Sequence, residues 1–486
     1  MTGQSSSKVA DLETKWLVQY GLLTAISLLA VILRFYKLGE WSFWIDEIFT
    51  LNNLRAHYFN LNDILRNIPP ARDWLSLSLI LSSGALNIFG TNEWSARLVP
   101  AVIGSISIPI LYFPIKALLG AVIGLISVLL LAVSPWHLFW SQNARFYTSL
   151  MLFYALAIFL TFLGLERGRS RYILFALLCL YLATGERLTG LFYVPVLISY
   201  FLVLLVFRLN GPHVSRWKYY GAIVLVPILI FGISDFYRYL TGHPSTLSAI
   251  LDTFAGQSNH SPFRLLLSII YRIGLPVFVL GIFGGVYMVI RNQRLGLFVV
   301  AAALVPIILL VMASPFVFTV DRYIFVALPF WMILSAAAIQ GLLSGTDGPG
   351  QWLALGVFVF LLLNPLGEDF LYYQYQNGGR PDWKNALQLV QRNLQPGDLV
   401  LSTRPEVGKY YFSGDVGNVN SFDLEANGWE GRRIWFLIDE ATGWVNPPIK
   451  EWILKNGELI EVVQVSVPGR DMPIRIYLSD PANQRK

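Results

Sequence analysis

The sequence is short of charge, cysteine and histidine. Charged residues make up only 14% of its 486 positions, against roughly 25% in soluble domains, whereas 55% are hydrophobic. This balance is typical of a chain that crosses a membrane several times. The single cysteine, Cys179, excludes an internal disulfide and a zinc site built from cysteines. The five histidines form no HxxxH or HxH pair, so a metal site built from histidines is not expected. A divalent metal stays an open alternative that the sequence does not support, and no cofactor is predicted.

The net charge of +6 does not indicate a nucleic-acid surface. Residues 367–486 carry 13 Lys and Arg against 16 Asp and Glu, so the positive charge arises in residues 1–366. There it concentrates in short loops at 166–171, 208–218 and 291–294. Basic loops between apolar stretches are typical of the cytoplasmic side of a membrane protein. Membrane lipids are therefore expected partners, and nucleic acid is not.

Apolar stretches near spanning length recur along the chain. They fall at about 17–34, 97–118, 121–138, 147–164, 171–184, 188–207, 217–234, 265–290, 295–314, 323–341 and 351–366. Even numbers of these stretches separate the three basic loops, so all three loops can be cytoplasmic. One further stretch, 74–90, holds four serines and is barely long enough to cross the membrane. Either this stretch is re-entrant or interfacial, or the list above has merged or missed a span elsewhere. The pattern predicts a polytopic α-helical membrane protein of about 11–13 spans.

The chain divides into three parts by composition. Residues 1–16 are polar and read as a cytoplasmic tail, and the apolar stretch that follows lacks an A-x-A cleavage site, which favours a retained first span. Residues 17–366 form the membrane domain, with an external acidic loop at 35–73. In residues 367–486, helical spacing at 382–394 and 447–457 mixes with strand patterns at 396–402, 432–440 and 459–479. This segment predicts a small extramembrane α/β domain on the outer face.

The acidic loop contains EWSFWIDEIFT, residues 40–50, in which Asp46 and Glu47 are adjacent among aromatic side chains. Aromatic residues of this kind gather at membrane interfaces. A carboxylate held there is suited to work as a general base. The alternative is an ordinary solvated loop, with the acids paired to Lys37, Arg55 or Arg72.

Arginines recur at the predicted outer ends of spans. Arg145 and Tyr147 follow one apolar stretch, Arg322 and Tyr323 precede another, and Arg97 begins a third. Arginine on the outer face runs against the usual charge bias and indicates an anion, such as a lipid or ligand phosphate. Guanidinium suits phosphate because its fork donates two hydrogen bonds. The alternative is side chains that reach lipid headgroups.

Other charged or titratable residues have simpler interpretations. Glu186 and Arg187 lie in a tight connection and are expected to form a local ion pair; the alternative is a contact with substrate. Arg272 lies inside an apolar stretch and is a functional candidate, unless the span bends at Pro276. His137 is interpreted as a hydrogen-bonded interfacial residue.

Four sequence blocks together resemble the C-type-fold membrane glycosyltransferases. They are the W-x-D-E of residues 44–47, the run from RLVPAVIGSISIPILYF to SPWHLFWSQNARFYTSLMLF, DRYIFVALPF, and PDWKNALQLVQRNLQPGDLVL. The branch they resemble contains the protein O-mannosyltransferases and the bacterial transferases that attach aminoarabinose to lipid A, and the likeness covers most of residues 17–412. It implies transfer of a sugar from a polyprenyl-phosphate donor to a lipid, glycan or protein acceptor. The expected location is the outer face of a bacterial inner membrane.

The resemblance also implies roles for individual residues. Asp46 matches the catalytic aspartate, a general base in an inverting single displacement, and Glu47 matches its acidic neighbour. Arg322 matches a basic residue near the donor phosphate. The other expected donor contacts are Asn143, Arg145, Tyr147, Tyr323 and Arg97.

The sequence also departs from the family pattern. NIPPARDW lacks the His-Pro-Pro or Glu-Lys-Pro of many relatives, and TGER stands where several have histidine. Donor sugar, acceptor and metal dependence therefore stay open. The alternative function is a multispan transporter or lipid flippase, but no internal repeat typical of transporters is found. A structural scaffold would leave the acidic loop unexplained.

Overall fold

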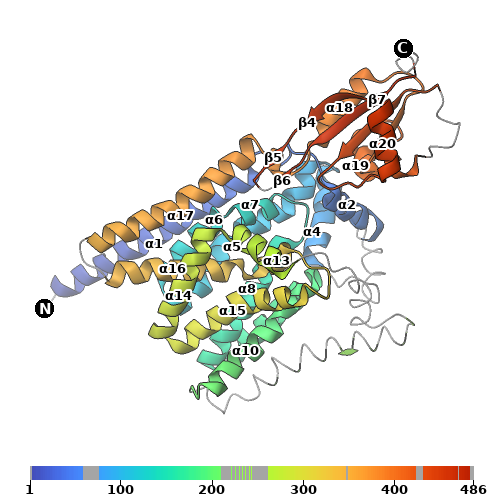
Figure 1. The fold of residues 1–486 in the computed structure, drawn as a ribbon. Coiled ribbons are helices and arrows are strands. Elements are labelled where there is room, and N and C mark those ends of the chain that lie inside the picture. The colour runs from blue at the N-terminus through green and yellow to red at the C-terminus, as the bar shows by residue number, and fades with distance from the viewer. Residues whose placement is uncertain are drawn as a thin grey trace. The chain divides into compact units, whose positions relative to one another are not determined.

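The computed structural model describes residues 3–57, 76–209, 261–345, 349–422, 431–468 and 470–481, with isolated positions between 221 and 242. These residues fall into two compact units (Figure 1). The first, here called the membrane unit, comprises Met1–Tyr36, His57–Gly84 and Leu98–Leu366. The second, the acidic-loop unit, comprises Lys37–Ala56, Ala85–Arg97 and Gly367–Lys486. The acidic-loop unit therefore collects three segments that are distant in the sequence.

Helices dominate the chain up to residue 374. They are α1 (Gly3–Phe35), α2 (Ile45–His57), α4 (Leu77–Phe89), α5 (Glu93–Leu119), α6 (Ala121–Ala132), α7 (Pro135–Ser141), α8 (Tyr147–Arg167), α9 (Ser170–Glu186), η1 (Leu188–Phe192), α10 (Tyr193–Val206), α13 (Pro262–Ile273), α14 (Leu275–Arg291), α15 (Gln293–Ala313), η3 (Asp321–Ala327), α16 (Leu328–Gly345) and α17 (Pro349–Gln374). Within the described residues, seven helices are long and apolar enough to cross a membrane, or up to nine if each bent pair is one span. The chain is thus an integral membrane protein with a polytopic helical fold, as predicted.

Helices occupy the predicted apolar stretches with one exception. The stretch at 217–234 lies outside the described residues, apart from isolated positions, so the total of 11–13 spans stays a prediction. Helix α4 has 13 residues, which at about 1.5 Å per residue gives roughly 20 Å, against a hydrocarbon core of about 30 Å. It is too short to cross alone, which favours the re-entrant or interfacial interpretation of this stretch.

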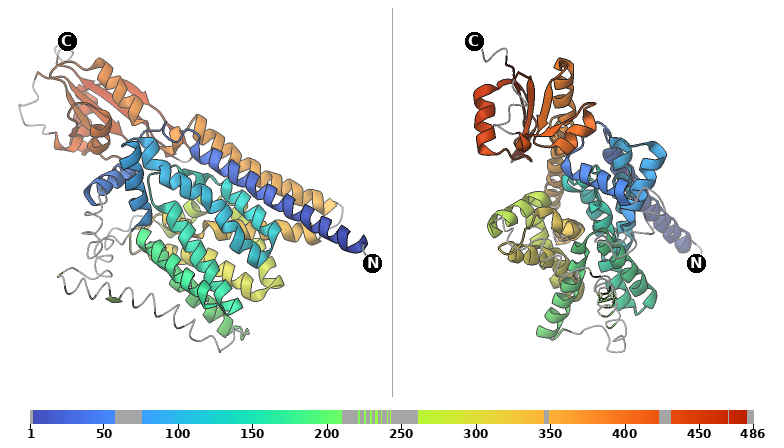
Figure 2. Two further views of the ribbon diagram at one scale, coloured as in Figure 1. Left: turned by 180° about the vertical axis from the view of Figure 1, so that it is seen from behind. Right: turned by 90° about the vertical axis from the view of Figure 1, so that its right-hand side faces the viewer.

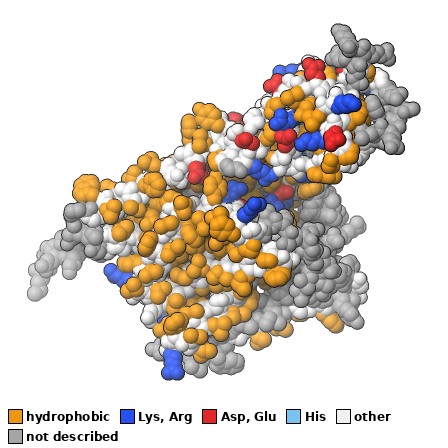
Figure 3. Space-filling model, in the orientation of Figure 1, with side chains coloured by type: hydrophobic (Ala, Val, Ile, Leu, Met, Phe, Trp, Pro, Cys, Tyr) orange, Lys and Arg blue, Asp and Glu red, His pale blue; other side chains and the backbone are white. Residues whose placement is uncertain are grey.

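The interior of the membrane unit is closely packed. Helix α8 is the most enclosed candidate span, with 83% of its apolar window buried, and it packs against α9. Helix α14 packs against α16 where Gly284 faces the backbone of Leu334; a Cβ at this glycine would overlap the Leu334 carbonyl. Small residues permit such close helix approach in membranes. The outward-facing side chains of this unit are largely hydrophobic (Figure 3).

In the part of the chain that the structure describes, two helix pairs are broken. Helices α6 and α7 meet at 61°, and Ser134 caps α7 by accepting a hydrogen bond from the N–H of His137. Helices α13 and α14 meet at 91° around Gly274, whose φ of +93° suits glycine. Pro276 lies in the first turn of α14. The predicted bend near Pro276 is therefore confirmed.

The acidic-loop unit contains a sheet, drawn as orange and red arrows in Figure 2. It has five strands in the order β2-β1-β3-β7-β4. The strands are β1 (Leu399–Ser402), β2 (Gly417–Asn418), β3 (Ile434–Asp439), β4 (Glu458–Val463) and β7 (Ile474–Ser479), and β5 (Ser466–Val467) pairs separately with β6 (Arg470–Asp471). Strand β1 runs parallel to β2 and β3, and β7 runs antiparallel to β3 and β4. The predicted α/β character of this region is confirmed.

Helices cover this sheet. They are α18 (Trp383–Asn393), α19 (Pro405–Tyr411) and α20 (Pro447–Asn456), with short turns η4 (Asn377–Gly379) and η5 (Val419–Ser421). Ile434, Phe436 and Ile438, alternate residues of β3, form a hydrophobic cluster with Ile449 and Ile453 of α20. Trp435 and Leu437 point to the opposite face and are buried too. Both faces of the central strand are therefore covered, which explains its unbroken apolar sequence.

Candidate functional site

Asp46 and Glu47 lie in the first turn of α2, where the helix dipole favours negative charge. The backbone N–H groups of Glu47 and Ile48 bond to the carbonyl of Trp44. The Glu47 carboxylate in turn accepts a 3.4 Å hydrogen bond from the N–H of Trp44, three residues earlier. This is one half of a capping box, in which the carboxylate of the third helical residue reaches back to the N–H before the helix; tryptophan has no side-chain acceptor for the other half. The two neighbouring side chains differ in burial: Asp46 is half-buried, and Glu47 is fully buried.

Glu47 is held by a buried ion pair. Nε and Nη2 of Arg97 each lie 2.8 Å from one carboxylate oxygen of Glu47, and neither side chain is exposed to solvent. Nη1 of Arg380 lies 3.6 Å from the same carboxylate. The alternative interpretation of Glu47 as a solvated loop acid paired with Lys37 or Arg55 is therefore wrong. Lys37 pairs with Glu40 instead, at 3.7 Å.

Arg97 uses every N–H it has inside this unit. Besides its two bonds to Glu47, Nη1 donates to the carbonyls of Leu38 and Trp41 at 3.2 and 3.0 Å, and Nη2 donates to that of Ser42 at 3.1 Å. A guanidinium has five N–H donors, and all five are engaged. None is left for a phosphate. The predicted role of Arg97 as a donor contact is therefore corrected: this residue holds the acidic loop.

The segment before α18 also contacts the acidic loop. Ser42 Oγ donates to the carbonyl of Pro381 at 2.8 Å and accepts from the N–H of Trp383 at 3.2 Å. Gly378 has φ +63°, and a Cβ there would lie 2.5 Å from the Trp41 ring, so only glycine fits. Burial and the nearby Arg97 lower the pKa of the Arg380 guanidinium, and the Glu47 carboxylate opposes this. Sequence reasoning missed this segment, although its Asn-Gly-Gly-Arg-Pro run marked a backbone of unusual shape.

In the membrane unit, two aromatic rings gather arginine side chains. The guanidinium carbon of Arg145 lies 5.0 Å from the centre of the Phe146 ring. That of Arg187 lies 5.6 Å from Phe146 and 4.5 Å from Tyr323. The structure therefore brings Arg145 and Tyr323, two predicted site residues, into one cluster, and it adds Arg187, which sequence reasoning had assigned to a local ion pair.

That local ion pair is wrong because Glu186 turns elsewhere. Its carboxylate accepts hydrogen bonds from the hydroxyls of Ser76 and Ser78, at 2.5 and 2.6 Å, and from the N–H of Ser78 at 2.9 Å. Glu186 is buried and these three donors satisfy it. Arg187 is left to lie over the rings of Phe146 and Tyr323.

Arg322 follows an acidic residue that has its own partners. Asp321 accepts from Arg272 at 3.1 Å and from Ser268 at 2.8 Å. Its other oxygen accepts from the N–H of Arg322 at 2.7 Å. Arg272 is therefore half-exposed and ion-paired, and it does not stand as an isolated charge inside a span.

Two further predicted residues are buried beneath this region. Asn143 and Tyr147 have no exposed surface, and the N–H of Arg145 bonds to the carbonyl of Asn143 at 2.6 Å in a tight turn. The centre of the Tyr147 ring lies 4.1 Å from the centre of the Trp140 ring and 4.7 Å from that of the Phe146 ring. They pack beneath the turn that carries Arg145.

The break between α6 and α7 leads directly to that turn. Arg34 of α1 donates to the carbonyl of Ala132 at 2.7 Å and to that of Leu131 at 3.3 Å, at the end of α6. Helix ends leave such carbonyls without intrahelical partners, and a cation is favoured there. Gln142 in turn donates to three carbonyls at the end of α1, including that of Tyr36 at 2.7 Å. Sequence reasoning missed Arg34, whose only signal was a charge at the end of the first span.

Arg34 also donates to His137, whose Nδ1 lies 2.7 Å from Nη2 of the guanidinium. Since a guanidinium can only donate, Nδ1 accepts and the ring proton of the neutral imidazole lies on Nε2. The Nε2 atom faces the hydroxyl of Ser107 at 3.4 Å. His137 is thus hydrogen-bonded, as its sequence context predicted, and it is buried.

The predicted site residues therefore divide between the units. Asp46, Glu47 and Arg97 belong to the acidic-loop unit, and Asn143, Arg145, Tyr147, Arg322 and Tyr323 belong to the membrane unit. Across the described residues, no group of three or more His, Cys, Asp or Glu side chains is placed to hold a metal ion.

Comparisons with known proteins agree on the fold. The profile of a family described as dolichyl-phosphate-mannose-protein mannosyltransferase matches residues 69–233. No curated protein sequence matches the chain. Similar solved structures include ArnT from Cupriavidus metallidurans bound to undecaprenyl phosphate, with a TM-score of 0.54, 16% identity, and coverage of 95% of this chain and 98% of ArnT. They also include the apo oligosaccharyltransferase of Archaeoglobus fulgidus, with a TM-score of 0.56, 13% identity, and coverage of 88% of this chain and 70% of that one.

Proposed function

We propose that the chain transfers a sugar from a polyprenyl-phosphate donor. It has the C-type fold of the membrane glycosyltransferases, as its sequence predicted, and it matches the protein mannosyltransferase profile over residues 69–233. The acceptor is a hydroxyl or amine of a lipid, glycan or protein. The observation that carries this proposal is the acidic pair: Glu47 is locked in a buried ion pair, while its neighbour Asp46 is half-buried at the same helix start.

A lipid-linked donor is supported by the similar ArnT structure, which holds undecaprenyl phosphate. Such a donor reaches the enzyme by diffusing within the bilayer, so the reaction needs no nucleotide-binding domain. An acceptor of the peptide kind has a precedent in the Archaeoglobus fulgidus oligosaccharyltransferase, which was solved with a tethered acceptor peptide at a TM-score of 0.51 and 12% identity, covering 87% of this chain and 69% of that one.

The proposed chemistry is a single displacement at the anomeric carbon. Asp46 takes the proton of the acceptor hydroxyl or amine, and the acceptor atom bonds to the anomeric carbon. The bond from that carbon to the phosphate oxygen breaks on the opposite face, and its electron pair stays on the phosphate. The anomeric centre is inverted. In this scheme Glu47 and Arg97 carry no substrate; they hold the loop that presents Asp46.

The leaving polyprenyl phosphate gains negative charge as this bond breaks. Arg145 and Arg322, joined by Arg187, are proposed to stabilise that charge, because donors aimed at developing charge supply much of the rate in such sites. Tyr323 and Phe146 hold two of these guanidiniums by ring contacts. Asn143 and Tyr147 are proposed to act indirectly, by supporting the turn that carries Arg145.

The proposed location is the inner membrane of a bacterium. Residues 1–16 face the cytoplasm, residues 17–366 form the transmembrane catalytic domain with its external loop at 35–73, and residues 367–486 lie on the outer face. This arrangement follows from the basic loops at 166–171 and 291–294, which mark the cytoplasmic side.

The test is Asp46→Asn, assayed by transfer from a polyprenyl-phosphate sugar in reconstituted vesicles. An amide cannot take the acceptor proton, so activity should fall by about 10²–10⁴, the usual contribution of a general base, while the thermal unfolding temperature stays near wild type. Glu40→Gln, an exposed acid in the same loop, is the matched control and should keep full activity. A loss of less than about tenfold for Asp46→Asn would remove it as the base. Substrate movement without any glycosylated product would favour a transporter.

A further inference from the structure

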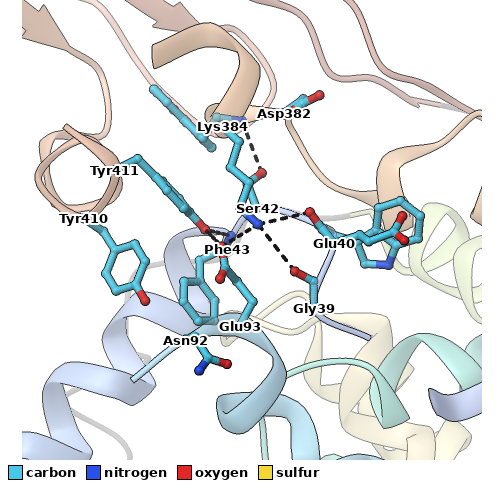
Figure 4. A network of polar contacts seen from close by, with 12 residues as sticks. Gly39, Glu40, Ser42, Phe43, Asn92, Glu93, Asp382, Lys384, Tyr410 and Tyr411 are labelled. Carbon is cyan, nitrogen blue, oxygen red and sulfur yellow. Dashed lines mark hydrogen bonds and ion pairs between the residues drawn. The ribbon is translucent and has the colours of Figure 1, made fainter. Parts of the chain in front are cut away.

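The backbone that leads to Asp46 is held by side chains, not by a helix or strand (Figure 4). All five carbonyls of residues 38–42 accept hydrogen bonds from two cationic residues. Arg97 takes three of them, as described above, and Lys384 takes the other two: its Nζ lies 3.1 Å from the carbonyl of Glu40 and 3.4 Å from that of Gly39. The three bonds from Arg97 are buried, where a backbone carbonyl needs a donor, whereas the Lys384 bond is part-buried at Gly39 and exposed at Glu40.

A tyrosine completes the arrangement at the next residue. The N–H of Phe43 donates to Tyr411 Oη at 2.5 Å, and the Tyr411 hydroxyl donates to Glu93 at 2.8 Å. Lys384 forms an ion pair with the same Glu93 carboxylate at 2.7 Å. Burial, and then the Glu93 carboxylate, raise the pKa of Tyr411, so its hydroxyl keeps the proton that it donates. Glu93 therefore joins Lys384 and Tyr411 into one network.

The two residues come from the C-terminal part of the chain. Lys384 lies in the first turn of α18 and Tyr411 at the end of α19, both within residues 367–486, whereas the loop they hold belongs to residues 37–56. Helix α2 begins at Ile45, two residues after Phe43. The direction in which the chain enters α2, and with it the place of Asp46 in its first turn, depends on the backbone that these side chains hold.

We propose that Lys384 and Tyr411 are positioning residues for Asp46, so that the C-terminal α/β region is a working part of the catalytic unit. This rests on the proposed function, in which Asp46 is the base. A base works only within hydrogen-bond reach of the proton that it takes, and a misplacement of about 1 Å can cost roughly 10²-fold in rate. The donor phosphate is assigned to other residues, so donor KM should change little when Asp46 is displaced.

The test uses Lys384→Met and Tyr411→Phe in the full chain, with donor and acceptor titrated separately. Each variant should lower kcat by about 10- to 100-fold, as a displaced base would, with donor KM within about twofold of wild type. Lys384→Arg should recover part of the rate, because a guanidinium can also reach Glu93 and the carbonyls. The controls are Lys409→Met, whose partner is the exposed Asp415, and Tyr375→Phe, an exposed tyrosine. Both should keep wild-type kcat.

Hydrogen exchange gives a reading that does not depend on activity. In Tyr411→Phe the Phe43 amide loses its acceptor, so a peptide covering residues 38–47 should exchange faster, while a peptide covering β3 should be unchanged. Wild-type kcat in both variants with unchanged exchange at 38–47 overturns the proposal, even if Asp46→Asn is inactive. Faster exchange throughout the region, without recovery in Lys384→Arg, indicates a merely structural role and also overturns it. Full activity in Asp46→Asn would instead contradict the proposed function, in which Asp46 is the general base.

Discussion

Arg97 and Glu47, 50 residues apart in the sequence, meet in a two-pronged ion pair from which solvent is excluded. Such a pair is costly to break because the remaining partner is left as a buried charge. Arg380 adds a second guanidinium within 3.6 Å of the same carboxylate, so loss of Glu47 would strand two positive charges. The neighbouring acids of the W-x-D-E block therefore have separate tasks: Asp46 is proposed as the base, and Glu47 holds the loop.

Replacing Glu47 should affect stability before chemistry. Glu47→Gln is expected to lower the free energy of unfolding by about 3–5 kcal/mol, as is usual when one partner of a buried pair is removed. Denaturant or thermal unfolding of the purified protein would measure this. Glu40→Gln removes an exposed partner and should cost no more than about 1 kcal/mol. Equal, small effects in both variants would show that the buried pair contributes little.

The arginines of the membrane unit can be tested by keeping their charge. Arg145→Lys and Arg322→Lys lose the fork that grips two phosphate oxygens, so donor use should weaken while acceptor KM changes little. Alanine should be worse than lysine at both positions. Arg171→Lys, an exposed residue in a basic loop, is the control. Wild-type kinetics in both lysine variants would mean that these side chains only reach lipid headgroups.

Arg34 should matter for folding although it contacts no proposed substrate. Arg34→Met removes the guanidinium that donates to the carbonyls of Leu131 and Ala132 and to the Nδ1 atom of His137. We expect the free energy of unfolding to fall by about 1–3 kcal/mol, the usual cost of a buried polar group left unsatisfied. Ser27→Ala, which removes a hydrogen bond within the same helix, should change it little. Identical unfolding of the two variants would contradict this role for Arg34.

The orientation of the chain can be tested with single cysteines after Cys179→Ala. Glu40→Cys and Asp415→Cys are exposed positions on the proposed outer side, and Ser170→Cys and Gln293→Cys lie in the basic loops. An impermeant thiol reagent added to intact cells should label the first two only, and the other two after permeabilisation. Buried positions on the same proposed side, such as Ser42 and Ser402, would not report orientation because the reagent could not reach them. Labelling of Ser170→Cys in intact cells would show that the span order is inverted or miscounted.

Local patterns were sufficient for much of the architecture. Apolar runs placed the membrane helices, because a span is decided by the hydropathy of its own residues. The short apolar run in 432–440 and the helical spacing in 447–457 placed β3 and α20 to within two residues, since these patterns act over short distances. The bend at Pro276 and the hydrogen-bonded state of His137 were also readable from their immediate neighbours.

Partners of charged side chains were not readable in this way. Arg97 and Arg145 both stand at the mouths of apolar stretches and received the same prediction, yet Arg97 spends all five donors on the acidic loop while Arg145 lies over Phe146. Glu186 was assigned to its sequence neighbour Arg187, but it binds two serines at the start of α4. The sequence by itself determined which segments are helices, which are strands, and that a carboxylate pair follows the first span. Only the tertiary structure decided which carboxylate is locked and which arginine locks it, because a buried charge takes whichever partner the packing brings within about 3 Å.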